Sequence, residues 1–168
     1  MDDLLDLLKN TIVKKGSFRS SSGRELDHYV DVREGLLTSR TSYLIAQRFG
    51  QIIPKGTTKI VGKGLGARLL LGPLCLMYGL NGATVLDDKE RVLHRETRSI
   101  LGYVPTVNDR VLIVDDVSTT GGSLRATRNI LQQTKTQIIG YAVVVKRGEI
   151  VLDAPLSYLF TDEQLLTA

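Results

Sequence analysis

Apolar and polar positions follow one another in blocks that predict a succession of strands and helices. Four consecutive apolar residues at 111–114 predict a strand that is buried on both faces. Leu4, Leu5, Leu8 and Ile12 have the spacing of an amphipathic helix that stops before Gly16. Further strands are predicted at 58–61, 83–86, 137–145 and 156–160, and further helices at 38–49, 69–80 and 124–131, with 161–168 as a tail. Because strands alternate with helices, we expect an α/β fold with a mostly parallel central sheet flanked by helices.

Length and composition predict one globular domain, residues 1–168. Of the 168 residues, 42% are hydrophobic and 24% are charged, and no repeat or linker interrupts the chain. The excess of 22 basic over 18 acidic residues is modest, and a site for a polyanionic small molecule explains it as well as nucleic acid does. The longest apolar run, 69–80, contains Pro73 and is too short to span a bilayer. The first residues lack the basic start of a signal peptide, and Cys75, expected to be a buried thiol, has no disulfide partner, so we expect a cytoplasmic protein.

The strand at 111–114 leads into a segment with the chemistry of a sugar-phosphate site. Asp115 and Asp116 follow the strand, and a turn of Thr, Gly and Ser residues separates them from the next helix. Backbone N–H groups at a helix N-terminus favour a phosphate, and the two carboxylates can accept hydrogen bonds from vicinal hydroxyls. The alternative is that the segment is only a connection between a strand and a helix.

Residues 114–123 resemble the phosphoribosyl pyrophosphate (PRPP) motif of the type I phosphoribosyltransferases. The resemblance implies that Asp115 and Asp116 hold the ribose 2- and 3-hydroxyls. It implies that the 5-phosphate is held by Thr119, Thr120, Gly121, Gly122 and Ser123, and that Ser118 also belongs to the PRPP-binding residues. It also implies a small N-terminal hood of about residues 1–35, and Mg²⁺ that arrives with PRPP near the two aspartates without direct protein ligands.

The segment 14–31 narrows the resemblance to the orotate phosphoribosyltransferases. On composition alone it reads as a polar loop before a short strand, with His28 at the surface. The residues that match the family in spacing are Lys14, Gly16, Phe18, Ser22, Gly23, Arg24, Tyr29 and Asp31. The resemblance implies that Lys14 reaches the PRPP or base site and that Tyr29 and Val30, with Thr119, contact the pyrimidine. It aligns Arg147 with an arginine that grips the orotate carboxylate, and a planar guanidinium suits that group.

The glycine-rich segment 62–68 follows a predicted strand, where glycines let the backbone approach a phosphate. Neither the dinucleotide fingerprint nor the Walker pattern fits it. In the resembled family this is the pyrophosphate loop, with Lys63, Gly64 and Arg68 as contacts. The alternative is that the glycines serve only tight packing between helix and strand.

The charged stretch 87–102 shows no convincing helical period and predicts a lid that closes over pyrophosphate; the alternative is a solvated hairpin. The family pattern here is Arg-Lys-x-x-Lys-x-His-Gly. This chain keeps its first lysine as Lys89 and its histidine as His94, which the resemblance makes catalytic. It departs at Asp88, Val92 and Arg95, where Val92 replaces the family's main catalytic lysine, and Lys146 replaces an aspartate in a later motif.

The sequence therefore predicts a transferase that moves phosphoribosyl from PRPP to orotate. The resemblance implies a homodimer in which the lid serves the partner's site. Two alternatives stay open: a phosphoribosyltransferase for another base, and a non-catalytic regulator with the same fold that binds PRPP or a nucleotide. Nucleic acid is an unlikely partner because no helix-turn-helix segment or strongly basic face is found.

Overall fold

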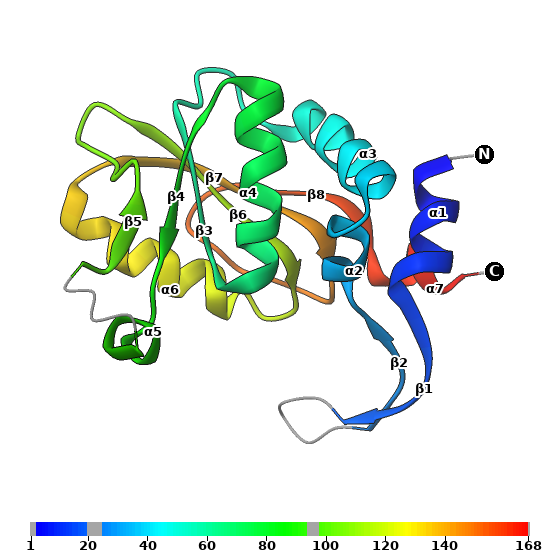
Figure 1. Cartoon of the computed structure of the whole chain (residues 1–168). Coiled ribbons are helices and arrows are strands. Elements are labelled where there is room, and N and C mark those ends of the chain that lie inside the picture. Colours follow the sequence, from blue (N-terminus) through cyan, green and yellow to red (C-terminus); the bar gives the residue numbers. More distant parts are fainter. Residues whose placement is uncertain (1–2, 20–24, 94–97, 168) are drawn as a thin grey trace.

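Six strands form the central sheet of the computed structural model, which describes residues 3–19, 25–93 and 98–167 (Figure 1). Their order across the sheet is β5-β4-β3-β6-β7-β8. Neighbouring strands are parallel except β4 and β5, which are antiparallel. The predicted mostly parallel α/β fold is confirmed. The strands are β3 (Lys59–Lys63), β4 (Asn81–Val85), β5 (Ile100–Gly102), β6 (Arg110–Ser118), β7 (Gln137–Lys146) and β8 (Leu156–Thr161).

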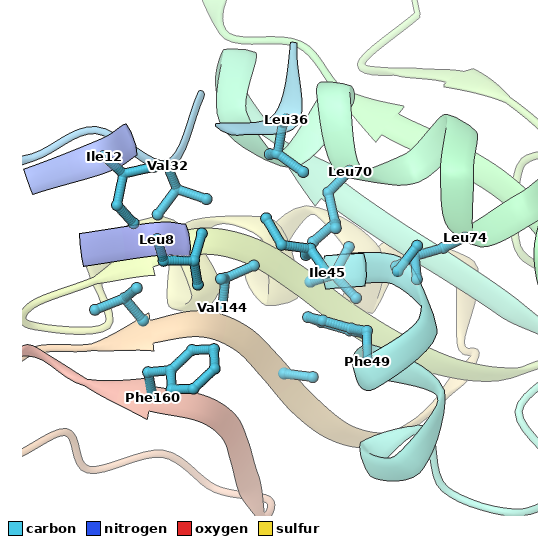
Figure 2. Close-up of a cluster of buried hydrophobic side chains, with 14 of the residues drawn as sticks. Leu8, Ile12, Val32, Leu36, Ile45, Phe49, Leu70, Leu74, Val144 and Phe160 are labelled. Carbon is cyan, nitrogen blue, oxygen red and sulfur yellow. The ribbon is translucent and has the colours of Figure 1, made fainter. Parts of the chain in front are cut away.

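Two hydrophobic cores cover the two faces of this sheet. Successive residues of a strand point to opposite faces, so Leu112 and Val114 of β6 enter one core, whereas Val111 and Ile113 enter the other. All four side chains are buried, as the continuous apolar run predicts. Figure 2 shows the first core, in which Phe49 and other side chains from the helices meet the strands.

More helices cover one face of the central sheet than the other. The first core is covered by α1 (Asp3–Ile12), α2 (Val32–Leu36), α3 (Ser39–Phe49), α4 (Gly64–Tyr78) and α7 (Asp162–Leu166). The second is covered by α6 (Gly122–Leu131). Among the described residues, no helix is long and apolar enough to cross a membrane. Cys75 of α4 is half-buried rather than fully buried, and its burial raises the pKa of the thiol.

A two-stranded hairpin projects from this body (Figure 1). It consists of β1 (Val13–Arg19) and β2 (Glu25–Val30), which pair antiparallel and belong to a sheet of their own. The polar loop expected from composition is therefore wrong for these residues. The rings of Phe18 and Tyr29 lie 5.8 Å apart across the hairpin, which explains how so polar a segment holds strand pairing. Ser22, Gly23 and Arg24 lie outside the described residues.

Several element boundaries differ from those predicted. Helix α4 begins at Gly64 rather than at 69, so most of the expected glycine loop is its first turn. Helix α3 ends at Phe49 with Gly50 as its C-cap, as predicted, but Gly50 has a right-handed helical conformation and the short helix η1 (Gly50–Ile52) follows directly, so no left-handed turn requires the glycine. Gly50 is needed for space instead, because a Cβ there would lie 2.1 Å from the Tyr78 hydroxyl. The tail contains α7, whose start is fixed by a capping box between Thr161 and Gln164.

Candidate active site

A pocket of about 570 Å³ opens where the carboxyl ends of β3, β6 and β7 meet the hairpin. Ligands of parallel α/β proteins bind at this end of the strands. Residues from distant parts of the sequence line it: Tyr29, Val30, Asp31, Arg33, Lys63, Gly64, Leu65, Gly66, Asp115, Asp116, Val117, Thr119, Ser123 and Arg147.

The acidic pair lies inside β6, which continues to Ser118. Because successive strand residues alternate between faces, the two side chains meet different helices. Asp116 lies against the first turn of α4, where a Cβ on Gly66 would be 2.0 Å from its Cγ. Asp115 is buried and interacts with Ser123 of α6, and its Oδ1 accepts the backbone N–H of Asp116 at 3.0 Å. Burial, followed by the nearby Asp116 charge, raises the pKa of Asp115 well above its usual range.

The predicted phosphate loop is only partly in contact with the pocket. Thr119 and Ser123 line it, while Ser118, Thr120, Gly121 and Gly122 do not, so their predicted contacts with the phosphate stay predictions. Gly121 precedes α6 with a positive φ of 77°, a conformation that glycine adopts at no steric cost. The Thr120 carbonyl accepts a hydrogen bond from the Arg125 guanidinium at 2.6 Å, which holds the turn in place.

Two of the three expected pyrophosphate contacts lie in the pocket. Lys63, the last residue of β3, and Gly64 line it. Arg68 does not; its guanidinium donates to Glu90 of α5 (Asp88–Leu93) at 2.6 and 2.9 Å and to the Val85 carbonyl at 3.2 Å. These contacts make Arg68 an anchor between α4 and α5, and its expected contact with pyrophosphate stays a prediction. Arg68 also holds the pKa of Glu90 down at about 2.

The hairpin supplies the end of the pocket predicted for the base. Tyr29 and Val30 line it as expected, together with Arg147 from the end of β7. Lys14 does not line it but forms an ion pair with Glu34 of α2, which raises the pKa of the lysine.

His28 is mostly buried rather than at the surface. Its Nε2 lies 3.4 Å from Nη2 of Arg147 and 3.5 Å from Oδ2 of Asp162. The expectation of a surface histidine is wrong because the hairpin packs over the end of β7. Nothing in the sequence around residue 28 predicts this contact.

Arg33 and Asp31 line the pocket although the sequence reasoning gave neither a role in the site. Asp31 caps α2 by accepting the Arg33 backbone N–H at 3.2 Å. Its carboxylate also receives two hydrogen bonds of 2.6 Å from the Arg33 guanidinium, which lowers the pKa of Asp31. An aspartate that directly precedes a helical turn is a capping signal, and it could have located α2.

The described part of the predicted lid is not a featureless loop. Residues 88–93 form the helix α5, and 100–102 form the edge strand β5. Lys89 is exposed on α5 and does not line the pocket, and Val92 is exposed. His94 and Arg95 lie outside the described residues. The catalytic roles predicted for Lys89 and His94 stay predictions.

Comparison with known proteins identifies the family. Residues 105–155 match the phosphoribosyl transferase domain. The orotate phosphoribosyltransferase of Methanosphaera stadtmanae is 31% identical over 154 residues, which cover 87% of this chain and 82% of that protein. This chain belongs to the orotate phosphoribosyltransferase family. A second member, from Mycobacterium leprae, is 31% identical over 150 residues, or 87% and 82% of the two chains.

A solved structure of the family agrees with the fold. The crystal structure of Mycobacterium tuberculosis orotate phosphoribosyltransferase in complex with PRPP superposes with a TM-score of 0.79 at 25% identity, over 97% of this chain and 96% of that one. The predicted resemblance to the orotate phosphoribosyltransferases is therefore confirmed.

Proposed function

We propose that this orotate phosphoribosyltransferase transfers the phosphoribosyl group of PRPP to orotate in the pocket between β3, β6, β7 and the hairpin. The products are orotidine 5'-monophosphate and pyrophosphate. One observation carries the assignment to this pocket. The acidic pair, the start of α6 and Arg147 line the same cavity, so groups suited to a ribose, a phosphate and a carboxylate face one another.

The reaction displaces pyrophosphate from the anomeric carbon of the ribose by a ring nitrogen of the base. Positive charge develops on the sugar as the bond to pyrophosphate breaks, so the protein's task is to fix the reactants and to stabilise charge. Asp115 and Asp116 accept hydrogen bonds from the ribose 2- and 3-hydroxyls in this assignment. Thr119 and Ser123 hold the 5-phosphate at the N-terminus of α6, where the helix dipole favours an anion. Lys63 lies where it can neutralise pyrophosphate charge.

Mg²⁺ fits this pocket as an ion that PRPP brings. Among the described residues, no group of three carboxylate, imidazole or thiolate side chains could hold a metal by itself. Mg²⁺ usually keeps several waters and binds through substrate phosphates with few protein ligands, so PRPP holds the ion in this proposal, and Asp115 and Asp116 lie near it while they accept the ribose hydroxyls. When bound, the ion supplies Lewis-acid stabilisation of the pyrophosphate oxygens.

The base is held between the hairpin and Arg147. Tyr29 and Val30 supply an apolar wall, and Arg147 supplies a fork that suits the orotate carboxylate. Arg33, tied to Asp31, adds a second guanidinium to the same cavity. Lys14 and Thr119 complete the proposed substrate-binding set. Lys14 must exchange its ion pair with Glu34 for substrate to take part.

The lid and the subunit arrangement belong to the same proposal. Lys89 and His94 stabilise the departing pyrophosphate, with the lid acting across a homodimer. Exposed apolar side chains near the end of α4 support a dimer: Leu76 is 87% exposed and Met77 is 36% exposed, and exposed apolar patches mark interfaces. The lone Cys75 fits the reducing conditions of the cytoplasm, where we place the enzyme.

Pyrophosphate release tests this function. The purified protein is incubated with Mg²⁺, PRPP and a panel of nucleobases, and turnover is expected with orotate alone. Arg147→Gln is expected to raise the KM for orotate about a hundredfold, because a charge-assisted hydrogen-bonded pair is lost. Arg110→Gln, at the opposite end of β6, is the matched control. Turnover with a different base favours the alternative that the protein is a phosphoribosyltransferase for that base. Tight PRPP binding without turnover on any base favours the alternative of a non-catalytic regulator.

A further inference from the structure

Arg147 lies at the junction of three elements that are far apart in the sequence. It follows β7 directly, and its backbone N–H donates to the Ser118 carbonyl of β6 at 2.9 Å. The register of the sheet pairs Lys146 with Thr161, so the next residues of the two strands, Arg147 and Asp162, emerge side by side. The sheet therefore fixes the backbone of Arg147, but it does not by itself fix the direction of its long side chain.

Two side chains hold that guanidinium. Oδ2 of Asp162 accepts a hydrogen bond from Nε of Arg147 at 3.0 Å, and the imidazole Nε2 of His28 lies 3.4 Å from Nη2. All three side chains are mostly buried: Arg147 and His28 are 16% exposed and Asp162 is 20% exposed. An ion pair so shielded from water holds its geometry better than a surface pair. The Nη1 group takes part in neither contact.

The surroundings of Asp162 indicate a role other than stabilising the fold. Its Oδ1 is buried and accepts no hydrogen bond within the described part of the chain. A buried carboxylate oxygen without a donor is costly, and such an atom calls for an explanation. The capping box of Thr161 and Gln164 fixes the start of α7, and with it the position from which Asp162 reaches Arg147. Asp162 itself does not line the pocket.

We propose that Asp162 is a positioning residue for the base, assisted by His28. It holds the Arg147 guanidinium so that the edge carrying Nη1 faces the substrate carboxylate, a role that rests on the proposed function of Arg147. The arrangement also ties the base end of the pocket to the hairpin, because His28 is the neighbour of Tyr29 on β2.

Steady-state kinetics of Asp162→Asn test the proposal. The amide keeps the size of the side chain and an oxygen acceptor but loses the charge. Since charge-assisted hydrogen bonds are roughly twice as strong as neutral ones, we expect the KM for orotate to rise about tenfold. The KM for PRPP and the affinity for Mg²⁺-PRPP, measured by calorimetry, are expected to stay within about twofold of wild type. Glu163→Gln, an exposed neighbour on α7, is the matched control.

A double-mutant cycle separates positioning from a general structural role. If Asp162 acts through Arg147, Asp162→Asn adds less than about twofold to the KM for orotate in the Arg147→Gln background. Additive effects, or an equal rise in both KM values, would overturn the proposal. His28→Gln changes the other contact of the same guanidinium without substituting a residue of α7. It is expected to raise the KM for orotate alone, so the proposal can be tested even if Asp162→Asn fails to fold. A wild-type protein that neither binds nor turns over orotate refutes the proposed function, whereas an active wild type with an unchanged Asp162→Asn variant refutes only the positioning role.

Discussion

Gly66→Ala adds one methyl group at the point where α4 touches the acidic pair. The new Cβ would lie 2.0 Å from both Cγ and Oδ2 of Asp116 and 2.4 Å from its Oδ1. Ordinary contacts between such atoms begin near 3.5 Å, so the carboxylate must move by about 1.5 Å or turn to another rotamer. The obstacle is the end of a short side chain, so the fold can yield there. The group that moves is the Asp116 carboxylate, which holds the ribose in the proposed reaction.

The variant is therefore expected to separate activity from stability. A misplacement of about 1 Å in a reacting geometry costs on the order of a hundredfold in rate, equivalent to about 2.7 kcal/mol. We expect kcat/KM for PRPP to fall by about that factor in the pyrophosphate-release assay. Thermal stability should change little, because alanine is favoured over glycine in a helix by up to about 1 kcal/mol, which offsets the displacement of Asp116.

Gly72→Ala is the control on the same helix. A Cβ at Gly72 meets nothing within 4 Å, so activity should be unchanged. Its effect on unfolding free energy should stay within about 1 kcal/mol, since the gain in helix preference is opposed by the following Pro73. A Gly66→Ala enzyme with wild-type kcat/KM for PRPP would refute the reasoning, because it would show that the position of Asp116 against α4 does not matter for catalysis.

Three further predictions concern the acidic pair and the lid. Burial raises the pKa of Asp115, so ionising this side chain destabilises the folded protein increasingly as the pH rises above 3.8. The Tm of Asp115→Asn should therefore exceed that of the wild type by a margin that grows between pH 4 and pH 7. The same variant should show no PRPP binding in calorimetry. Glu90, with a pKa of about 2 beside Arg68, contributes stability that is present above its ordinary value of 4.5 and lost as the pH falls toward 2. The Tm deficit of Glu90→Gln should therefore be constant near neutrality and shrink below about pH 4.5; a deficit independent of pH contradicts the pairing. Lys89→Ala should lower kcat about a hundredfold if it stabilises pyrophosphate, whereas the exposed Lys55→Ala should not, and full activity of Lys89→Ala rejects its assignment to the lid.

Several residues that the sequence predicted for the site line the pocket, and the prediction of the acidic pair has a physical basis. A continuous apolar run is buried on both faces wherever helices cover both sides of a parallel sheet, so β6 could be located from 111–114 alone. The carboxyl end of that strand lies at the ligand-binding edge of such sheets, which puts Asp115 and Asp116 in the pocket. The family resemblance then added Tyr29, Val30 and Arg147 to the predicted site, and no hydrophobic periodicity in the sequence indicates these residues.

The structure differs from the predictions where contacts across the fold decide what a residue touches. Arg68 has the charge and position of a phosphate contact, but Glu90, 22 residues later, binds it instead. The polar hairpin is held by pairing between β1 and β2 and by the contact of Phe18 with Tyr29, which composition does not show. Arg33 enters the pocket because Asp31 both caps α2 and grips its guanidinium.

By itself, the sequence determined the α/β class, the buried central strand and the position of the acidic pair, because burial patterns and strand ends are local properties of the chain. Its motifs also determined the family. The tertiary structure decided which of the predicted cations face the pocket. Lys14, Arg68 and Arg147 look alike in sequence, yet two are neutralised by carboxylates away from the cavity, while Asp162 holds the third at its wall. A charged side chain takes its function from the partner it meets, and that partner is set by how distant segments pack.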